Sequence, residues 1–287
     1  DHILPDVPLR QWVLSVPFDV GSLMARDPRL LSSVLRIFLD VISKWQTKQA
    51  TANGMEGGKT GAVSFVQRFG STLNRHLHFH CLVLYGVYVA GKNNGTLAFH
   101  PSRVPRNDDL HSLVAAILRR VRTLLKRRGF IGEPPSEPKT PSVERCIAEQ
   151  NVAPGFFANV DSEGCIVPSP PPPLKRKATS SAAETHGFSV DASVLIPAAD
   201  FAGRERLCRY GARHPFALER LSETADGRIA YKMKKPRQGK RFLVMTPVGF
   251  LRRLALLVPP PFYPLVRYHG VLAPNSKWRS RIVRVST

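Results

Sequence analysis

Cysteine, acidic side chains and long apolar runs are all scarce in this sequence of 287 residues. The four cysteines, Cys81, Cys146, Cys165 and Cys208, stand far apart and form no C-x-x-C pair, which argues against a cysteine-rich zinc module and against a disulfide framework. No apolar run approaches the roughly 20 residues needed to span a bilayer. The opening residues also lack the basic start and apolar stretch of a signal peptide. We therefore expect a protein of the reducing cytoplasm, and one that begins within a longer gene product.

The shortage of acids leaves a large positive charge. Forty-two Lys and Arg stand against 21 Asp and Glu, which gives a formal net charge of +21. Such an excess is costly in self-repulsion unless a polyanion offsets it, and nucleic acid is the usual polyanion. An anionic membrane surface is the competing explanation. The composition therefore favours a nucleic-acid-binding protein.

Apolar periodicity divides the chain into helices and strands that alternate irregularly. Helical spacing is predicted for residues 28–48 behind an Asp27 cap, 109–128, 201–213 behind an Asp200 cap, and 247–257. Strand-like runs cover 9–16, 62–67, 76–89, 186–196, 227–234 and 240–245, with a hairpin between the second and the third. This order predicts an α+β fold with a mainly antiparallel sheet flanked by helices, and argues against a doubly wound one.

A change in composition marks the middle of the chain. Residues 132–185 are rich in Pro, Ser and Ala and include the run from Pro170 to Pro173. Such a stretch cannot bury enough apolar surface to fold tightly. We expect a flexible insert there, which separates two parts of one larger domain at 1–131 and 186–287.

Basic residues gather at two places where they could follow a nucleic-acid backbone. One group lies in the second half of the 109–128 helix and the other in the later strand pair: Arg119, Arg122, Lys126 and Arg127, then Lys234 and Lys235. An ordinary solvated helix face is the alternative for the first group, because cations are also favoured at a helix C-terminus. If both groups contact phosphates, binding should weaken steeply with salt.

The run from Asn74 to Leu84 is the most informative stretch of the sequence. Alternate residues of a strand share a face, so His76, His78 and His80 point one way while the apolar residues between them point into the core. Neutral imidazoles two residues apart on one strand can bind a single divalent ion. A lone histidine here would be structural, whereas three on one face indicate a metal site.

Two histidines need a further ligand to complete such a site. His76 shares the face, but it stands two residues beyond the pair formed by His78 and His80. Gln67, on the preceding hairpin strand, could lie beside them if the turn sets the register suitably. An amide oxygen suits magnesium or manganese and is a poor ligand for structural zinc. The alternative for Gln67 is an ordinary edge residue.

A tyrosine stands at the margin of the apolar arc of the 201–213 helix. At about 100 degrees per residue, the arc is formed by Phe201, Leu207, Cys208 and Ala212. Tyr210 would rest its ring on the core while its hydroxyl meets the guanidinium groups of Arg206 and Arg213, which could hold a phosphate. By this geometry alone a structural tyrosine is the more common outcome.

The motifs together resemble the HUH transposases that move DNA by rolling-circle transposition, in particular the single-tyrosine common-region branch. Three stretches in one order carry the resemblance, which spans nearly the whole chain outside the Pro-rich insert. They are Gln67-Arg68-Phe69-Gly70 through Asn74 with His78-Phe79-His80, then Leu207-Cys208-Arg209-Tyr210 through Arg213 and Pro215, then Arg267-Tyr268-His269-Gly270-Val271 with Ala273-Pro274-Asn275.

The resemblance implies that His78 and His80 hold the metal, with Gln67 as third ligand, and that Tyr210 is the nucleophile. The implied fold is the HUH endonuclease domain, with the metal strand central in an antiparallel sheet. The implied activity is nicking and rejoining of single-stranded DNA at transposon ends through a 5′-phosphotyrosine link, in the cytoplasm and at the bacterial nucleoid. The absence of a G-x-x-x-x-G-K-[ST] run agrees with chemistry that needs no ATP.

The sequence departs from that family at three points. Arg206 stands where two-tyrosine relatives have a second tyrosine, His214 replaces the proline usual before Pro215, and the N-terminal cysteine-rich zinc-binding module is absent. Three other readings stay open: a non-catalytic single-stranded nucleic-acid binder of RRM-like shape, a metal-dependent nuclease that uses water, and a decayed transposase fragment.

Overall fold

The computed structural model describes residues 4–70, 72–91, 96–131, 159–160, 166–167, 182–237, 239–259 and 261–283, without the side chains of residues 159, 160, 166, 167, 235 and 237. Its centre is a seven-stranded sheet in the order β14-β2-β3-β1-β9-β8, with β10 also paired to β1. The strands are β1 (Leu9–Ser15), β2 (Gly61–Phe69), β3 (Arg75–Leu84), β8 (Ala182–Thr185), β9 (Phe188–Asp191), β10 (Leu195–Ile196) and β14 (Val266–Gly270). Every pairing in it is antiparallel, which confirms the predicted α+β class.

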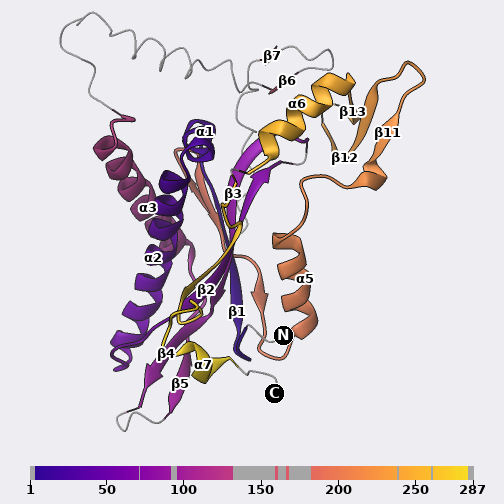
Figure 1. Cartoon of the computed structure of the whole chain (residues 1–287). Coiled ribbons are helices and arrows are strands. Elements are labelled where there is room, and N and C mark those ends of the chain that lie inside the picture. The colour runs from indigo at the N-terminus through magenta and orange to yellow at the C-terminus, as the bar shows by residue number, and fades with distance from the viewer. Residues whose placement is uncertain are drawn as a thin grey trace, which may run out of the picture.

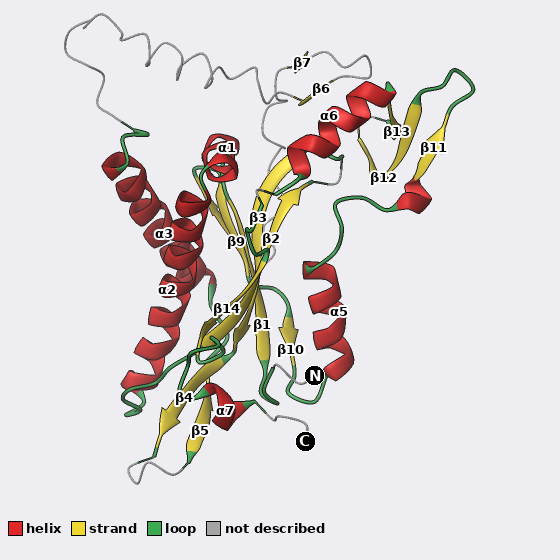
Figure 2. Ribbon diagram, viewed as in Figure 1, coloured by secondary structure: helices red, strands yellow, loops and turns green. Residues whose placement is uncertain are grey.

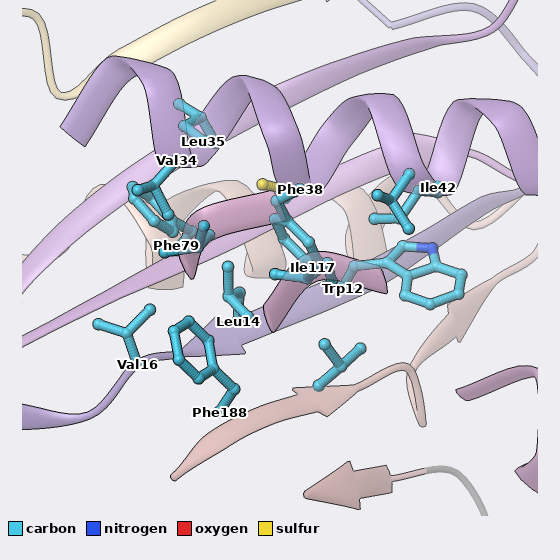
Figure 3. Close-up of a cluster of buried hydrophobic side chains, with 14 of the residues drawn as sticks. Trp12, Leu14, Val16, Val34, Leu35, Phe38, Ile42, Phe79, Ile117 and Phe188 are labelled. Atoms are coloured by element: carbon cyan, nitrogen blue, oxygen red, sulfur yellow. The ribbon is translucent and has the colours of Figure 1, made fainter. Parts of the chain in front are cut away.

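One face of this sheet is covered by helices α1 (Phe18–Arg26), α2 (Pro28–Ala52) and α3 (Asn107–Arg127) (Figure 1). The Asp27 carboxylate accepts hydrogen bonds from the backbone N–H groups of Arg29 and Leu30, so the predicted N-cap of α2 is confirmed. Side chains from the helices meet Trp12, Leu14 and Phe79 in the main core (Figure 3). Because Phe79 points into this core, its neighbours His78 and His80 point to the opposite face.

The opposite face is covered by α5 (Phe201–Gly211) and by the C-terminal segment with α7 (Arg279–Ile282) (Figure 2). The Asp200 side chain caps α5 through the N–H group of Gly203, as predicted. Arg204 is 5% exposed and donates to the backbone carbonyls of Pro5 and Val7. These bonds fasten the start of α5 to the segment that precedes β1.

A smaller unit stands beyond the turn between β2 and β3. It consists of the sheet β11-β12-β13 and of α6 (Pro247–Leu257), whose predicted bounds are confirmed. The strands are β11 (Leu221–Glu223), β12 (Ile229–Arg237) and β13 (Lys240–Met245), preceded by the 3₁₀ turn Leu218–Arg220. Phe69 and Leu73 from the turn pack against Tyr231, Met245 and Leu257. This cluster joins the smaller unit to the end of the sheet where β3 begins.

The predicted strand over 76–89 is wrong as one element, because it divides into β3 and β4 (Gly86–Ala90) after Tyr85. Strand β4 leaves the main sheet and pairs with β5 (Leu97–Pro101). The close approach of β5 requires glycine at the junction, since a Cβ on Gly86 would collide with the carbonyl oxygen of His100.

The prediction of a flexible insert over residues 132–185 is wrong at the C-terminal end of this range. Strand β8 lies inside this range, pairs with β9 and buries Ala183 in the main core, so its four residues belong to the sheet. The range also contains the short pair β6 (Asn159–Val160) and β7 (Ile166–Val167). The rest of the expected insert lies outside the described residues.

Among the helices that the structure describes, none combines the length and the apolar character that crossing a bilayer requires.

Candidate active site

The three histidines of β3 share one face, as the strand pattern predicts. The imidazole centroids of His76 and His78 are 5.0 Å apart, and those of His78 and His80 are also 5.0 Å apart. His76 is exposed at the start of the strand, whereas His80 is 6% exposed. The row therefore runs from solvent into a partly enclosed site.

Hydrogen bonding fixes which nitrogen of His78 is available to a ligand. Its Nδ1 lies 3.0 Å from the backbone carbonyl of His76, and a carbonyl can only accept. The proton of the neutral ring therefore sits on Nδ1, and Nε2 keeps its lone pair. A metal-bound histidine characteristically holds its other ring nitrogen in this way.

His80 carries an orphaned polar atom. Its Nδ1 lies 3.0 Å from the Gln11 amide, and its Nε2 is buried with no hydrogen-bond partner in the described part of the chain. A buried polar atom of this kind is costly unless something binds it. An amide can turn its oxygen toward Nδ1–H, which frees the Nε2 lone pair. Gln11 is thus a supporting residue that the sequence reasoning missed. Its only signal was its position in β1, which places it on the face of the sheet that carries His80.

Burial keeps both imidazoles neutral. Desolvation first, then the nearby His76 and His80 rings, lowers the pKa of His78 to about 3. Desolvation and the positive charge of Arg213 lower the pKa of His80 to about 4. Neutral imidazoles are the form that binds metal, so no proton has to leave these rings at neutral pH.

Gln67 occupies the position directly opposite His78 in the β2–β3 ladder. Its Nε2 donates to the backbone carbonyls of Tyr210, at 2.9 Å, and Gly211, at 3.1 Å. These two bonds fix the orientation of the amide and leave Oε1 facing Arg213, whose Nη2 is 3.5 Å away. Gln67 is 1% exposed, so an ordinary edge position is excluded.

Tyr210 lies on the same side of the sheet as the histidines. Its ring centroid is 5.3 Å from that of His80, and the two rings are nearly perpendicular. The Tyr210 side chain is 40% exposed, so its hydroxyl can be reached from solvent. The tyrosine helix and the histidine strand, more than 120 residues apart in sequence, therefore meet in one site.

A glycine permits this close approach. Gly211 is buried against Phe65 of β2, and a Cβ there would lie 2.6 Å from the Phe65 ring. Any larger residue would push the end of α5 away from the strand that pairs with β3. Gly211 therefore sets how near Tyr210 comes to His80.

Arg213 lies over the tyrosine but not at its hydroxyl. Its guanidinium carbon is 4.4 Å from the centroid of the Tyr210 ring and 5.3 Å from that of Phe69. The interpretation that the Tyr210 hydroxyl meets this guanidinium is wrong, because the group stacks on the ring face. Its Nε is buried without a partner among the described residues, so it can still bind an anion.

The helical-wheel reading of α5 is also corrected in part. Leu207 and Cys208 are half-buried, as predicted, but Phe201 is 54% exposed and Ala212 is exposed. Arg204 takes the buried position instead, because its guanidinium finds acceptors in the segment before β1 and in the backbone carbonyl of Ala198.

The predicted nucleic-acid contacts divide between the two sides of the sheet. Lys234 is close enough to Arg213, on the tyrosine side, for the two charges to interact: burial first, and then the charges of Arg213 and Arg220, lower the pKa of Lys234. Arg206 is exposed on α5. The side chain of Lys235 lies outside the described residues. The remaining four stand on α3, across the sheet from Tyr210 (Figure 1): Arg119, Arg122, Lys126 and Arg127.

A cavity of about 490 Å³ opens beside the site. Gln67 and Arg213 line it, together with apolar side chains that include Phe69, Phe216 and Leu257. Its volume lies within the range of small-ligand pockets, and aromatic walls suit an unstacked base.

The donors present fit a divalent ion with mixed ligands. Within the described residues no three or more of His, Cys, Asp and Glu form a group that could hold a metal ion, so His78 and His80 would need an amide or a substrate oxygen. Gln67, directly opposite His78 in the ladder, is the amide side chain whose oxygen could serve. Such a set resembles the oxygen-rich ligation of magnesium or manganese more than structural zinc.

Comparison with protein families identifies one match. Residues 61–279 match the model of the family described as "Putative transposase", which covers more than half of the chain and includes β2, β3 and α5. Neither the curated proteins nor the solved structures give a match.

Proposed function

Since the chain belongs to the "Putative transposase" family, we propose that it nicks and rejoins single-stranded DNA by the tyrosine chemistry of HUH endonucleases, in rolling-circle transposition. The observation that carries the proposal is the 5.3 Å separation between the rings of Tyr210 and His80, on one face of the sheet. Such a reaction requires a nucleophile next to a metal site, and here a phenol lies beside two neutral imidazoles that could bind the metal.

His78, His80 and Gln67 would hold the divalent ion, magnesium or manganese. The orphaned Nε2 of His80 and the Nε2 of His78, free because Nδ1 carries the proton, support this assignment. The ion would polarise a non-bridging phosphate oxygen.

Tyr210 is the nucleophile in the proposed reaction. Its Oη attacks phosphorus, the P–O3′ bond breaks, the phenol proton is released, and the leaving 3′ oxygen takes up a proton. The 5′-phosphate then remains joined to Tyr210. Because the link conserves the phosphodiester, attack by a 3′-hydroxyl can later release Tyr210 and rejoin a strand without ATP. Arg206 stands where two-tyrosine relatives have a second tyrosine, so Tyr210 would be the nucleophile in each transfer that this chain carries out.

Arg213, Lys234 and Arg206 would hold the strand next to the scissile phosphate, with Lys235 further along β12. Arg213 sits between the tyrosine ring and the Gln67 oxygen, where it can bind a phosphate oxygen without leaving its stack. The adjoining cavity would receive the neighbouring base. Residues 1–131 and 182–287 would form one catalytic unit around the rest of the insert, because β1 pairs with both β3 and β9 and β9 pairs with β8. With DNA as its substrate, the protein would act in the cytoplasm, at the nucleoid.

The test is a covalent-adduct assay. Incubation with labelled single-stranded DNA and manganese should give a band that resists denaturant and carries the DNA by its 5′ end. Tyr210→Phe should remove this adduct while leaving DNA binding intact. Tyr268→Phe, a half-buried tyrosine of β14, is the matched control and should keep it.

The rival functions give different products in the same assay. A water-using nuclease yields free 5′-phosphates and no adduct, and a non-catalytic binder or decayed fragment yields neither. An adduct that persists in Tyr210→Phe would refute the assignment of the nucleophile.

A further inference from the structure

The outward faces of α2 and α3 carry a cluster of basic side chains on the side of the sheet opposite Tyr210. We define this outer basic face by six residues: Arg29, Arg36, Arg119, Arg122, Lys126 and Arg127. All six are exposed, and none of them forms an ion pair with another described residue. The candidate active site does not use them.

Helical spacing arranges these residues in two rows. Arg29 and Arg36 are two turns apart on α2, and Arg119, Arg122 and Lys126 follow one stripe of α3. The apolar stripes of both helices are buried against the sheet. The basic rows therefore point away from it, into solvent.

Two ion pairs set the rows side by side. Arg128 of the α3 end binds Asp27 at 2.8 Å, and Arg120 binds Asp40 at 2.5 Å, so the helices run antiparallel. The two acids that border this face, Asp27 and Asp40, are thus already in ion pairs, and Asp40 also binds Lys44. Neither acid therefore pairs with any of the six defining residues.

We propose that the outer basic face binds the sugar-phosphate backbone of duplex DNA, as a second nucleic-acid surface separate from the catalytic one. Packed helices lie about 8–10 Å apart, which falls between the widths of the minor and major grooves, about 6 and 12 Å. Two such rows of long side chains can reach phosphates on both strands that border a groove. A single strand offers no second row of phosphates to match.

The lack of stacking groups also favours a duplex. Proteins that bind single strands use exposed aromatic rings on which bases stack. No large hydrophobic side chain on α2 or α3 is exposed, whereas Tyr210 is exposed on the opposite side. Contacts limited to phosphates carry no direct sequence information. This face would thus hold flanking or target duplex in any sequence, while the other face handles the single strand.

The test compares binding to a mixed-sequence duplex of about 20 base pairs and to a single strand of equal length, over a range of salt. The variant is the triple substitution Arg119→Gln, Arg122→Gln and Lys126→Gln. The matched control removes the same charge from β12 and β13, with Lys232→Gln, Lys240→Gln and Arg241→Gln, all at exposed positions.

For the outer triple variant we expect the duplex dissociation constant to rise by about tenfold or more, with a salt slope lower by about 2–3. Adduct formation on single-stranded DNA should stay within about threefold of the unchanged protein. The proposal holds even if no adduct forms, since duplex binding is measured without the chemistry. It is overturned if the control weakens duplex binding as much, if the outer variant loses single-strand binding equally, or if it loses affinity only for anionic phospholipid vesicles.

Discussion

The side-chain amide of Gln67 donates a hydrogen bond to the backbone carbonyl of Tyr210, with a separation of 2.9 Å. Gln67 also lies directly opposite His78 in the β2–β3 ladder. It therefore contacts the end of α5, through Tyr210 and Gly211, from a position next to the histidines. Because the amide nitrogen is engaged by α5, the oxygen is the atom left for a ligand. The two halves of the site are coupled through this single side chain.

Gln67→Leu should therefore impair both halves. Two buried carbonyls of α5 lose their donor, which should lower the free energy of unfolding by about 1–3 kcal/mol. Metal-dependent adduct formation should fall by at least tenfold.

Gln67→Glu separates the two roles of the residue. It keeps a ligand oxygen but turns a carboxylate toward the same carbonyls, so manganese binding by calorimetry should persist while stability falls. A Gln67→Leu protein with undiminished metal affinity would remove Gln67 from the ligand set.

Gly211→Ala tests the contact between α5 and β2. The added Cβ meets the Phe65 ring at 2.6 Å, so the helix must shift. We expect a loss of about 1–3 kcal/mol in the free energy of unfolding and a fall of at least tenfold in adduct formation, with DNA affinity little changed. Gly21→Ala is the control, because its Cβ would meet its nearest neighbour at an ordinary 3.6 Å. Equal activity of the two variants would contradict this role for Gly211.

Arg213→Lys tests the stacked guanidinium. Lysine keeps the charge but loses the planar group that lies over Tyr210 and Phe69, so adduct formation should slow by about tenfold while the salt slope of DNA binding changes little. Arg209→Lys, at the end of α5 and paired with Glu205 in solvent, should change the rate by less than about twofold. If Arg213→Lys slowed adduct formation as little as Arg209→Lys does, the positive charge alone would be sufficient at position 213 and the stacked guanidinium would have no role.

The buried histidines predict a loss of stability in acid. The folded-state pKa of His80 is about 4, against 6.5 for the exposed ring, so the unfolded chain binds more protons between these values. The free energy of unfolding should hold above about pH 6.5 and decline as the pH falls toward 4, by up to about 1.4 kcal/mol per pH unit for this ring.

The measurement is denaturant unfolding at a series of pH values. His80→Gln removes the titrating ring and should flatten the slope. Manganese binds the neutral imidazole, so in the unchanged protein it should make the free energy of unfolding depend more steeply on pH. An identical slope in His80→Gln would show that other groups cause the acid sensitivity.

Local patterns in the sequence were sufficient for most elements. The cap of α2 at Asp27, the cap of α5 at Asp200 and the bounds of α6 follow from side chains that bond to or pack against their own neighbours in the chain. The common face of His76, His78 and His80 follows from the two-residue period of a strand. The family match over residues 61–279 includes these histidines and α5, but not the cap of α2.

Contacts between distant segments could not be read in this way. Arg204 is buried because the segment before β1 brings it acceptors, and β8 is ordered because Ala183 reaches the main core. The basic helix predicted to contact the strand lies instead across the sheet from Tyr210, since the side of a sheet on which a helix packs depends on its connections.

The sequence by itself determined which histidines and which phenol are the candidate groups, and that the three histidines share one face of a strand, because these depend on residue type and on the two-residue period of a strand. Only the tertiary structure decided that Tyr210 and His80 meet, that Gln67 joins them and that α3 faces elsewhere. The physical reason is that such distances are set by the register of β2 against β3 and by the packing of Gly211 on Phe65, which involve residues far apart in the chain.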